Sequence, residues 1–454
     1  SWFRRLLKHF HWTWVVWMSA LRCDMTNPKR GFNLYAYARV LISTRFIPNA
    51  ILPISITMFS NNAIASLVAI FLLQGATQCS TQSVSPLAGK ITLSTGWKPV
   101  LYLVQPRNFL EIASNFSGAV LDSAVILPDG NFVFSNIPQT EAGVLFQLCI
   151  QQAGNRFPNQ LLDYDPLLSN YMPVVLQKGR RMDVRAEADR FQATFSIKNP
   201  SAENLALLQL RDARHQAFRQ ERNQMAEGMH SDEAKLLDRE AAQQRFRQQL
   251  MAFADSSASL WPALVAIRWV SPVGDYERVP EFLFGQCEKW RSRMPENQWA
   301  GQLCQAAKRE KLPILIGDLI PDYPLPMLSG DTAQLYRLLG RRLTILDIWA
   351  SWCAPCRREN REVLSPLWAE HKDRGLQILG YSIDSSPSAW KAAVVKDDAI
   401  WPHASHLSGD ATPFLEKLRI TSIPTNFILD AQGKVIAKNL HGDSLKAFVE
   451  NYLK

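Results

Sequence analysis

The sequence predicts three regions, in which a β-rich, sandwich-like region and a helical region precede an α/β unit. Over residues 84–201, short apolar runs alternate with turn residues, which is typical of strands. Over residues 202–310, apolar positions recur every three or four residues, as on amphipathic helices. From residue 314 to 454, strand patterns alternate with helical ones, which favours an α/β layer structure. Residues 1–78 differ in composition from all three regions and form a leader.

The overall composition is that of a globular protein. Of 454 residues, 47% are hydrophobic and 20% are charged, which excludes a disordered or collagen-like chain. The formal net charge is +9, but the leader alone holds eight basic residues and one acidic residue, so the remainder is nearly neutral. Because a nucleic-acid-binding surface needs its basic residues on a folded domain, nucleic acid is not an expected partner.

The leader has the features of an export signal. No charged residue occurs between Arg45 and Lys90, and residues 63–73 (AIASLVAIFLL) form an apolar run of signal-peptide length. The basic residues before this run predict that its N-terminal side stays in the cytoplasm and the rest is exported. A buried core helix is the alternative. We therefore expect a protein of the bacterial cell envelope, on the periplasmic side.

Three fates of the leader remain open. Cys79 follows the apolar run and could be a lipoprotein cysteine, although Gln78 stands where a small residue is expected. Signal cleavage and retention as an anchor are the other two. Lipidation or retention would associate the protein with the membrane through its leader.

The β-rich and helical regions carry no recognisable chemistry. The segment 122–132, with Asp129-Gly130-Asn131 at its turn, predicts a hairpin. Residues 205–251 predict amphipathic helices that are interrupted near Gly228 and have a solvated charged face. Cys287 and Cys304 either face each other on adjacent helices or remain unpaired core thiols.

A redox motif lies between a strand and a helix of the α/β unit. A buried strand is predicted at 343–349 and is followed by the run 352–356 (WCAPC). At a helix N-terminus, unpaired N–H groups and the helix dipole stabilise the thiolate of the first cysteine, Cys353. Cys356 lies one turn later, where it can attack a mixed disulfide formed by Cys353. The pattern predicts a thiol–disulfide exchange pair.

Two other interpretations of the cysteines are a zinc site and an inert disulfide. A structural zinc site needs four ligands, but the sequence has no second Cys-x-x-Cys, and His403 and His406 lie far away without a supporting pattern. We expect neither a metal nor a cofactor.

Four segments of the α/β unit resemble the TlpA/ResA group of envelope thioredoxin-like proteins. They are 347–356 (DIWASWCAPC), 357–359 (RRE), 422–427 (SIPTNF) and 430–434 (DAQGK). The resemblance implies a thioredoxin-like fold at the C-terminus. The preceding regions resemble, more loosely, a domain of unknown function that often precedes such thioredoxin domains, which implies no activity.

The resemblance also implies roles for individual residues. Cys353 matches the attacking cysteine and Cys356 the resolving one. Pro424 matches a cis-proline that faces the disulfide and exposes the backbone of Ile423 to pair with an extended substrate. Glu359 matches an acid that the group keeps near its active site.

Asp347 matches the buried acid of thioredoxins, at a position where many TlpA-like proteins have a neutral residue. Burial would favour its neutral form and let it exchange a proton with Cys356. The alternatives are a satisfied core acid for Asp347 and a helix-dipole acid for Glu359. Trp352 either shields the disulfide or packs in the core.

These observations predict an exported thiol–disulfide oxidoreductase. It would reduce protein disulfides in the envelope, because Ala354-Pro355 without a histidine lies between the cysteines, and a membrane thiol relay would restore the dithiol. One alternative is a thiol peroxidase, but Leu346 and Ala350 occupy positions where that chemistry requires Pro and Thr or Ser. The other is an envelope module in which residues 84–310 bind a partner and the redox activity is secondary.

Overall fold

The computed structural model describes residues 87–115, 118–138, 140–227 and 232–454. All of them belong to one compact unit, Thr81–Lys454. The predicted leader and Cys79 lie outside the described residues. Within these ranges, no helix combines the length and the apolar character that a membrane crossing requires.

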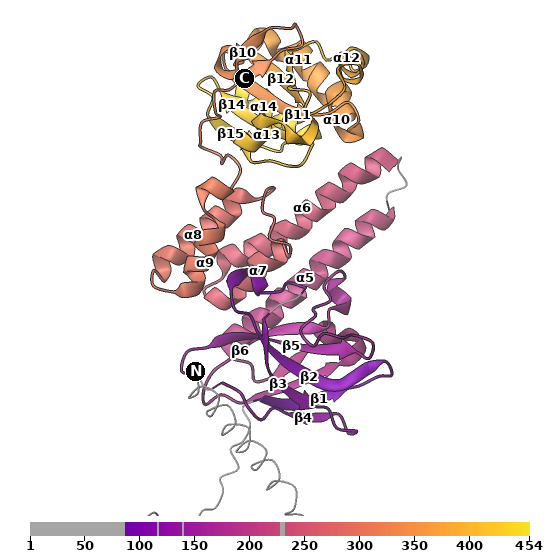
Figure 1. Cartoon of the computed structure of the whole chain (residues 1–454), viewed down its shortest axis with the longest axis vertical. Helices are drawn as coiled ribbons and strands as arrows, with labels where there is room; N and C mark the ends of the chain where they lie inside the picture. Colours follow the sequence, from indigo (N-terminus) through magenta and orange to yellow (C-terminus); the bar gives the residue numbers. More distant parts are fainter. Residues whose placement is uncertain (1–86, 116–117, 139, 228–231) are drawn as a thin grey trace, which may run out of the picture. The chain divides into compact units, whose positions relative to one another are not determined.

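Two four-stranded sheets make up the β-rich region (Figure 1). Their strand orders are β4-β1-β7-β8 and β3-β2-β5-β6. β7 alternates buried and more exposed residues, as expected for a strand with one face on a core. β6 is buried throughout because α5 covers it. The elements are β1 (Leu87–Thr92), β2 (Trp97–Gln105), β3 (Ala119–Val125), β4 (Asn131–Val133), β5 (Val144–Gln152), β6 (Tyr171–Leu176), β7 (Met182–Glu187), α4 (Phe191–Thr194) and β8 (Ser196–Lys198).

The hairpin expected over 122–132 is wrong, because its two strands belong to different sheets. β3 pairs with β2, whereas β4 pairs with β1. The turn itself is present: the N–H of Gly130, which has a φ of 86°, donates to the carbonyl of Leu127 at 2.8 Å. Ile126 and Phe132 on either side of the turn are buried in the same core. The chain therefore crosses from one sheet to the other at this turn.

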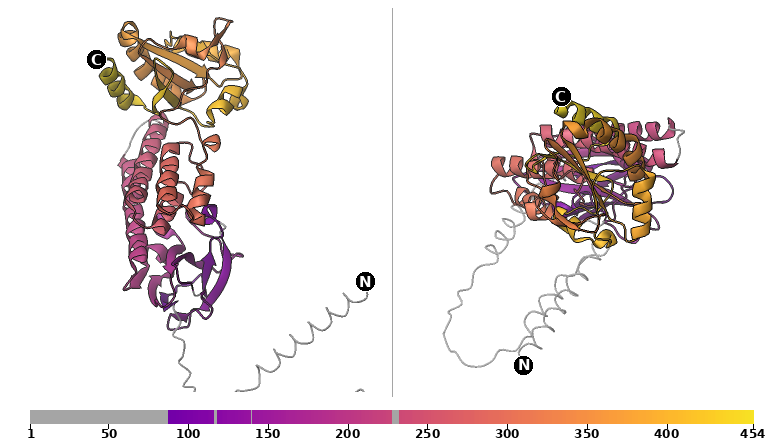
Figure 2. Two further views of the ribbon diagram at one scale, coloured as in Figure 1. Left: turned by 90° about the vertical axis from the view of Figure 1, so that its left-hand side faces the viewer. Right: turned by 90° about the horizontal axis from the view of Figure 1, so that it is seen from above.

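The helical region consists of five helices. They are α5 (Ala202–Glu227), α6 (Asp232–Ser256), α7 (Leu260–Val270), α8 (Pro280–Arg293) and α9 (Gln298–Ala306). α5 and α6 lie side by side (Figures 1 and 2). The predicted interruption near Gly228 lies outside the described residues. Every residue of α7 is buried, since α7 packs against both α5 and α6. A disulfide between Cys287 and Cys304 joins α8 to α9, so these cysteines face each other.

A five-stranded mixed sheet forms the centre of the C-terminal region, in the order β13-β12-β11-β14-β15. β11 is parallel to β12 and antiparallel to β14. All seven residues of β11 are buried, because Leu346 and Ile348 enter one apolar core and Leu343 and Ile345 enter a second one. This is the predicted α/β arrangement. The strands are β9 (Pro324–Pro326), β10 (Thr332–Gln334), β11 (Leu343–Trp349), β12 (Leu376–Ser382), β13 (His403–Ala404), β14 (Thr425–Asp430) and β15 (Val435–Lys438).

The helix after β11 begins at the motif cysteines, where the sequence predicts a helix N-terminus. α10 (Ala354–Glu359) continues through a π-helical stretch (Asn360–Leu364) into α11 (Ser365–His371). The remaining helices are α12 (Pro387–Lys396), α13 (Pro413–Leu418) and α14 (Gly442–Leu453).

Candidate active site

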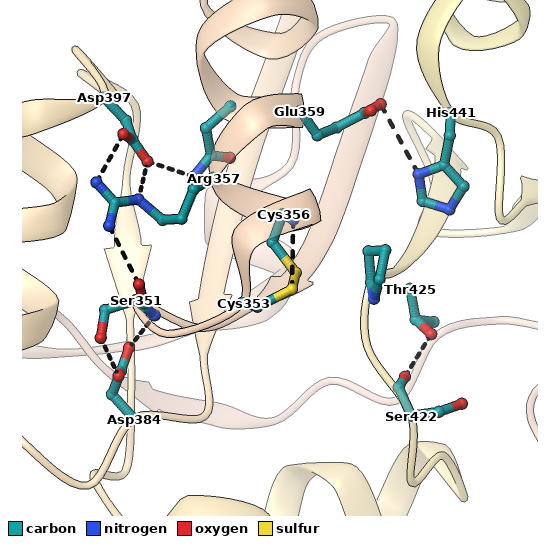
Figure 3. Close-up of a disulfide and its surroundings, with 12 residues drawn as sticks. Ser351, Cys353, Cys356, Arg357, Glu359, Asp384, Asp397, Ser422, Thr425 and His441 are labelled. Atoms are coloured by element: carbon teal, nitrogen blue, oxygen red, sulfur yellow. Dashed lines mark hydrogen bonds and ion pairs between the residues drawn. A yellow bond between two sulfur atoms is a disulfide. The ribbon is translucent and has the colours of Figure 1, made fainter. Parts of the chain in front are cut away.

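The junction of β11 and α10 brings the two motif cysteines together. Cys353 is the N-cap residue of α10, and Cys356 lies in its first turn. They form a disulfide with 5.3 Å between their Cα atoms (Figure 3). The backbone N–H of Cys356 also donates to Sγ of Cys353 at 3.3 Å. Both residues are nearly inaccessible, at 6% and 2% exposure, so an exchange partner must approach closely from the Cys353 side.

A cis peptide bond lies at the same end of the sheet as the cysteines. The bond joins Ile423 to Pro424, and the next residue, Thr425, is the register partner of Ile348 near the end of β11. The loop that carries Ser422 and Thr425 therefore lies beside the disulfide (Figure 3). Thr425 Oγ1 donates to the carbonyl of Ser422 at 2.7 Å, which closes the loop around the cis bond.

Asp347 is buried within β11, at 4% exposure. Desolvation, with the nearby charge of Glu359 as a second cause, raises the pKa of Asp347 to about 8. A carboxyl with such a pKa is mostly neutral at pH 7, and this pKa lies close to the ordinary pKa of a thiol, about 8.5. The pKa of the buried acid is thus close to the ordinary pKa of a cysteine thiol.

Glu359 lies at the end of α10 and is also buried, at 7% exposure. Its Oε1 accepts a hydrogen bond from the N–H of Gly442 at 3.1 Å and lies 3.8 Å from Nδ1 of His441 (Figure 3). His441 was not predicted from the sequence. It is 82 residues from Glu359 in the chain, and a single histidine before a helix gives no local signal.

A second group of polar residues fixes the turn before Cys353, and no sequence motif predicts this group. Asp384 accepts hydrogen bonds from the N–H of Ser351 at 2.8 Å and from its hydroxyl at 2.5 Å. Arg357 donates to the carbonyl of Ser351 at 3.1 Å and to Asp397 at 2.7 Å (Figure 3). The Asp397 side chain is fully buried and also pairs with Arg361 at 3.0 Å. These contacts hold the turn on the side away from the cis peptide.

Trp352 is 63% exposed, so the alternative of core packing is wrong for this residue. Ile423 is half-buried and packs against the core that contains the cysteines. Among the described residues, no group of three or more His, Cys, Asp or Glu side chains is placed to hold a metal ion. His403 and His406 make contacts of their own, with the carbonyl of Ala399 at 2.9 Å and the hydroxyl of Tyr381 at 2.6 Å.

Comparison with known proteins gives this region a family. The model of the AhpC/TSA family matches residues 316–438. Thiol-disulfide oxidoreductase ResA of Bacillus cereus is 29% identical over 148 residues, which is 33% of this chain and 81% of that protein. Thioredoxin-like protein YneN of Bacillus subtilis is 28% identical over 136 residues, 29% of this chain and 76% of that protein. Both alignments fall well short of the whole chain.

A solved structure, the thioredoxin domain of a thiol-disulfide oxidoreductase from Bacteroides vulgatus, is 28% identical and covers 31% of this chain and 99% of its own, with a TM-score of 0.29. The predicted resemblance and the predicted fold class are confirmed by the family match, the ResA relative and the order of strands and helices. Residues 316–438 therefore match the AhpC/TSA family, and the C-terminal thioredoxin-like region is similar to thiol–disulfide oxidoreductases of the ResA type.

Proposed function

We propose that this protein is an exported thiol–disulfide oxidoreductase that reduces protein disulfides in the bacterial envelope through Cys353 and Cys356. The observation that carries the proposal is the Cys353–Cys356 disulfide at the start of α10, beside the cis peptide that precedes β14. The ResA homologues support the reaction class.

The reaction divides into two exchanges. The Cys353 thiolate attacks one sulfur of a client disulfide, which forms a mixed disulfide and releases the other client sulfur as a thiolate. The Cys356 thiolate then attacks Sγ of Cys353, which frees the second client thiol and leaves the Cys353–Cys356 disulfide. Two electrons pass to the client, so an external dithiol, supplied by a membrane thiol relay, must reduce the pair again.

Asp347 and Glu359 serve the second exchange. The Cys356 thiol must lose its proton before it attacks, and the ionised fraction of Asp347 can accept that proton because its pKa of about 8 is close to that of a thiol. Glu359 acts on Asp347 through its charge. We assign a proton-transfer role to Asp347 and a positioning role to Glu359.

Client binding involves the exposed ring of Trp352 and the backbone of Ile423. In the part of the chain that the structure describes, no hydrogen bond involves the N–H or C=O of Ile423. An extended client segment can pair with these groups as an added strand does. Trp352 offers apolar contact area on the same side as Cys353.

Export is supported by the disulfide in the helical region. The Cys287–Cys304 bond lies between two helices and outside the redox motif, and structural disulfides persist chiefly in oxidising compartments. The charge and hydropathy pattern of the leader points the same way.

A trapping experiment tests the proposal. Cys356→Ser, expressed with the leader, should accumulate mixed disulfides with envelope proteins through Cys353, and Cys353→Ser should accumulate none. The reduction potential of the wild-type pair should lie near that of thioredoxin, about −270 mV. A value near about −120 mV, as in strong oxidants, would reverse the direction, and rapid oxidation by peroxide without client trapping would favour the peroxidase alternative.

A further inference from the structure

The loop between α7 and α8 reaches the cis-proline loop of the C-terminal domain. Hydrogen bonds within the α7–α8 region hold the α7–α8 loop in place. The Tyr276 hydroxyl donates to the carbonyl of Ile267 at 3.1 Å, and Asp275 accepts from the N–H of Glu277 at 2.9 Å. Tyr276 is buried in the core that the β-rich and helical regions share. The loop thus presents Glu277 and Arg278 from a rigid base.

Glu277 binds the residues before the cis peptide with both oxygens of its carboxylate. Oε2 accepts from the N–H of Thr421 at 2.9 Å and from its hydroxyl at 2.6 Å. Oε1 accepts from the N–H of Ser422 at 3.0 Å and from its hydroxyl at 2.6 Å. One carboxylate therefore accepts hydrogen bonds from the backbone and hydroxyl donors of two successive residues.

Arg278 binds the residues after the cis peptide. Its Nη1 donates to the carbonyl of Pro424 at 2.8 Å and to Oγ1 of Thr425 at 3.0 Å. The two neighbouring residues of the α7–α8 loop therefore hold positions 421–422 and 424–425, and they leave out Ile423, the residue between them. The contacts thus lie on both sides of Ile423, whose backbone N–H and C=O a client can use.

We infer that Glu277 and Arg278 are positioning residues that hold the cis-proline loop so that the free backbone groups of Ile423 face an extended polypeptide client. This inference rests on the proposed function and gives the region before the thioredoxin-like domain a role in it. Charged hydrogen bonds on both sides fix the loop in the geometry that strand-like pairing requires. The chemistry of the cysteine pair does not depend on these contacts, because the hydrogen bonds described above go to residues 421, 422, 424 and 425.

The inference separates polypeptide clients from small disulfides. A small disulfide needs only access to Cys353, whereas a polypeptide also needs to pair with the backbone N–H and C=O of Ile423. Weakening the Glu277 contacts should therefore raise KM for a polypeptide and leave the reaction with a small disulfide unchanged. A variant that only damages the fold would instead slow the reaction with both substrates.

The test uses the full chain as Glu277→Gln, which replaces two acceptors with one acceptor and one donor. Its matched control is Glu281→Gln, which removes the 2.7 Å ion pair with Lys438 close to the same loop but does not touch residues 421–425. The probes are insulin, as a polypeptide disulfide, and hydroxyethyl disulfide. We expect Glu277→Gln to raise KM for insulin about tenfold or more, with kcat, the reduction potential and the rate with hydroxyethyl disulfide unchanged.

Three results would overturn the inference while the wild type still reduces insulin. They are an unchanged KM in Glu277→Gln, equal losses with both substrates, and the same rise in KM in Glu281→Gln. If the wild type reduces neither substrate, the proposed function itself fails, so the two failures are distinguishable. Arg278→Met provides a second, independent variant with the same expected split between the substrates.

Discussion

Oε1 of Glu359 lies 3.8 Å from Nδ1 of His441, and both groups are close to the redox motif. Glu359 is also one of the causes that raise the pKa of Asp347. The pKa of Asp347 on the central strand thus responds to the charge of Glu359 on the following helix. Oε1 of Glu359 in turn accepts a hydrogen bond from Gly442 at the start of α14. Residues of β11, α10 and the distant α14 therefore act on one proton equilibrium.

Glu359→Gln should lower the pKa of Asp347 below about 8, because it removes the neighbouring negative charge. The rate at which Cys356 resolves a preformed mixed disulfide should then reach its plateau at a lower pH than in the wild type. Stopped-flow measurement across pH 5 to 9 checks this. Glu362→Gln, an exposed acid on the same helix, is the matched control, and identical profiles for wild type and Glu359→Gln would contradict the assignment.

Asp347→Asn should change how stability depends on pH. The pKa of Asp347 is about 8 in the folded protein and about 3.8 when unfolded, so the folded state holds an extra proton between these values. The associated stability is fully present below about pH 4 and is lost as pH rises toward 8, amounting to a few kcal/mol. Denaturant unfolding at several pH values should therefore give a flatter curve for Asp347→Asn, and parallel curves would show that Asp347 titrates normally.

The Cys287–Cys304 disulfide should stabilise the protein without taking part in exchange. It closes a loop with a sequence separation of 17, for which the chain-entropy model gives about 3 kcal/mol. The double variant Cys287→Ser/Cys304→Ser should lose roughly that free energy of unfolding and still reduce hydroxyethyl disulfide at the wild-type rate. A large loss of rate in folded protein would mean that this disulfide belongs to the redox pathway.

Asp397→Ala should destabilise the protein by about 3 kcal/mol, because it leaves the largely buried guanidinium of Arg357 without its carboxylate. The same change should loosen the turn at Ser351, to which Arg357 also donates. Urea unfolding gives the first effect, and the rate of Cys353 alkylation in the reduced protein gives the second. Asp398→Asn is a suitable control at the neighbouring position, because Asn tolerates the positive φ of 51° found there, and it should change neither quantity.

The parts of the site that lie next to one another in the sequence were predictable. The seven buried residues of β11 and the cysteines that follow form an uninterrupted local pattern, and Pro424 stands in a motif of its own. The fold class followed from the same patterns, because the spacing of apolar residues differs between strands and helices.

The supporting residues were not predictable, because they reach the site only through the fold. Asp397 is 40 residues from Arg357, and Glu277 is 145 residues from Ser422, and neither acid stands in a recognisable motif. The hairpin error has a related cause. Asp129-Gly130-Asn131 encodes a turn correctly, but whether the two flanking strands pair or separate depends on Ile126 and Phe132 meeting in a core that other strands complete.

The contacts of Glu277 also bear on how such a protein can evolve. Its partners, Thr421 and Ser422, are encoded far downstream, beyond the natural junction near residue 312 at which one domain gene could be joined to another. A recombination at that junction would separate an acceptor from its donors. We therefore expect residues 277–278 and 421–425 to be inherited together, so that the thioredoxin-like region of this chain is a poor candidate for exchange between otherwise unrelated genes.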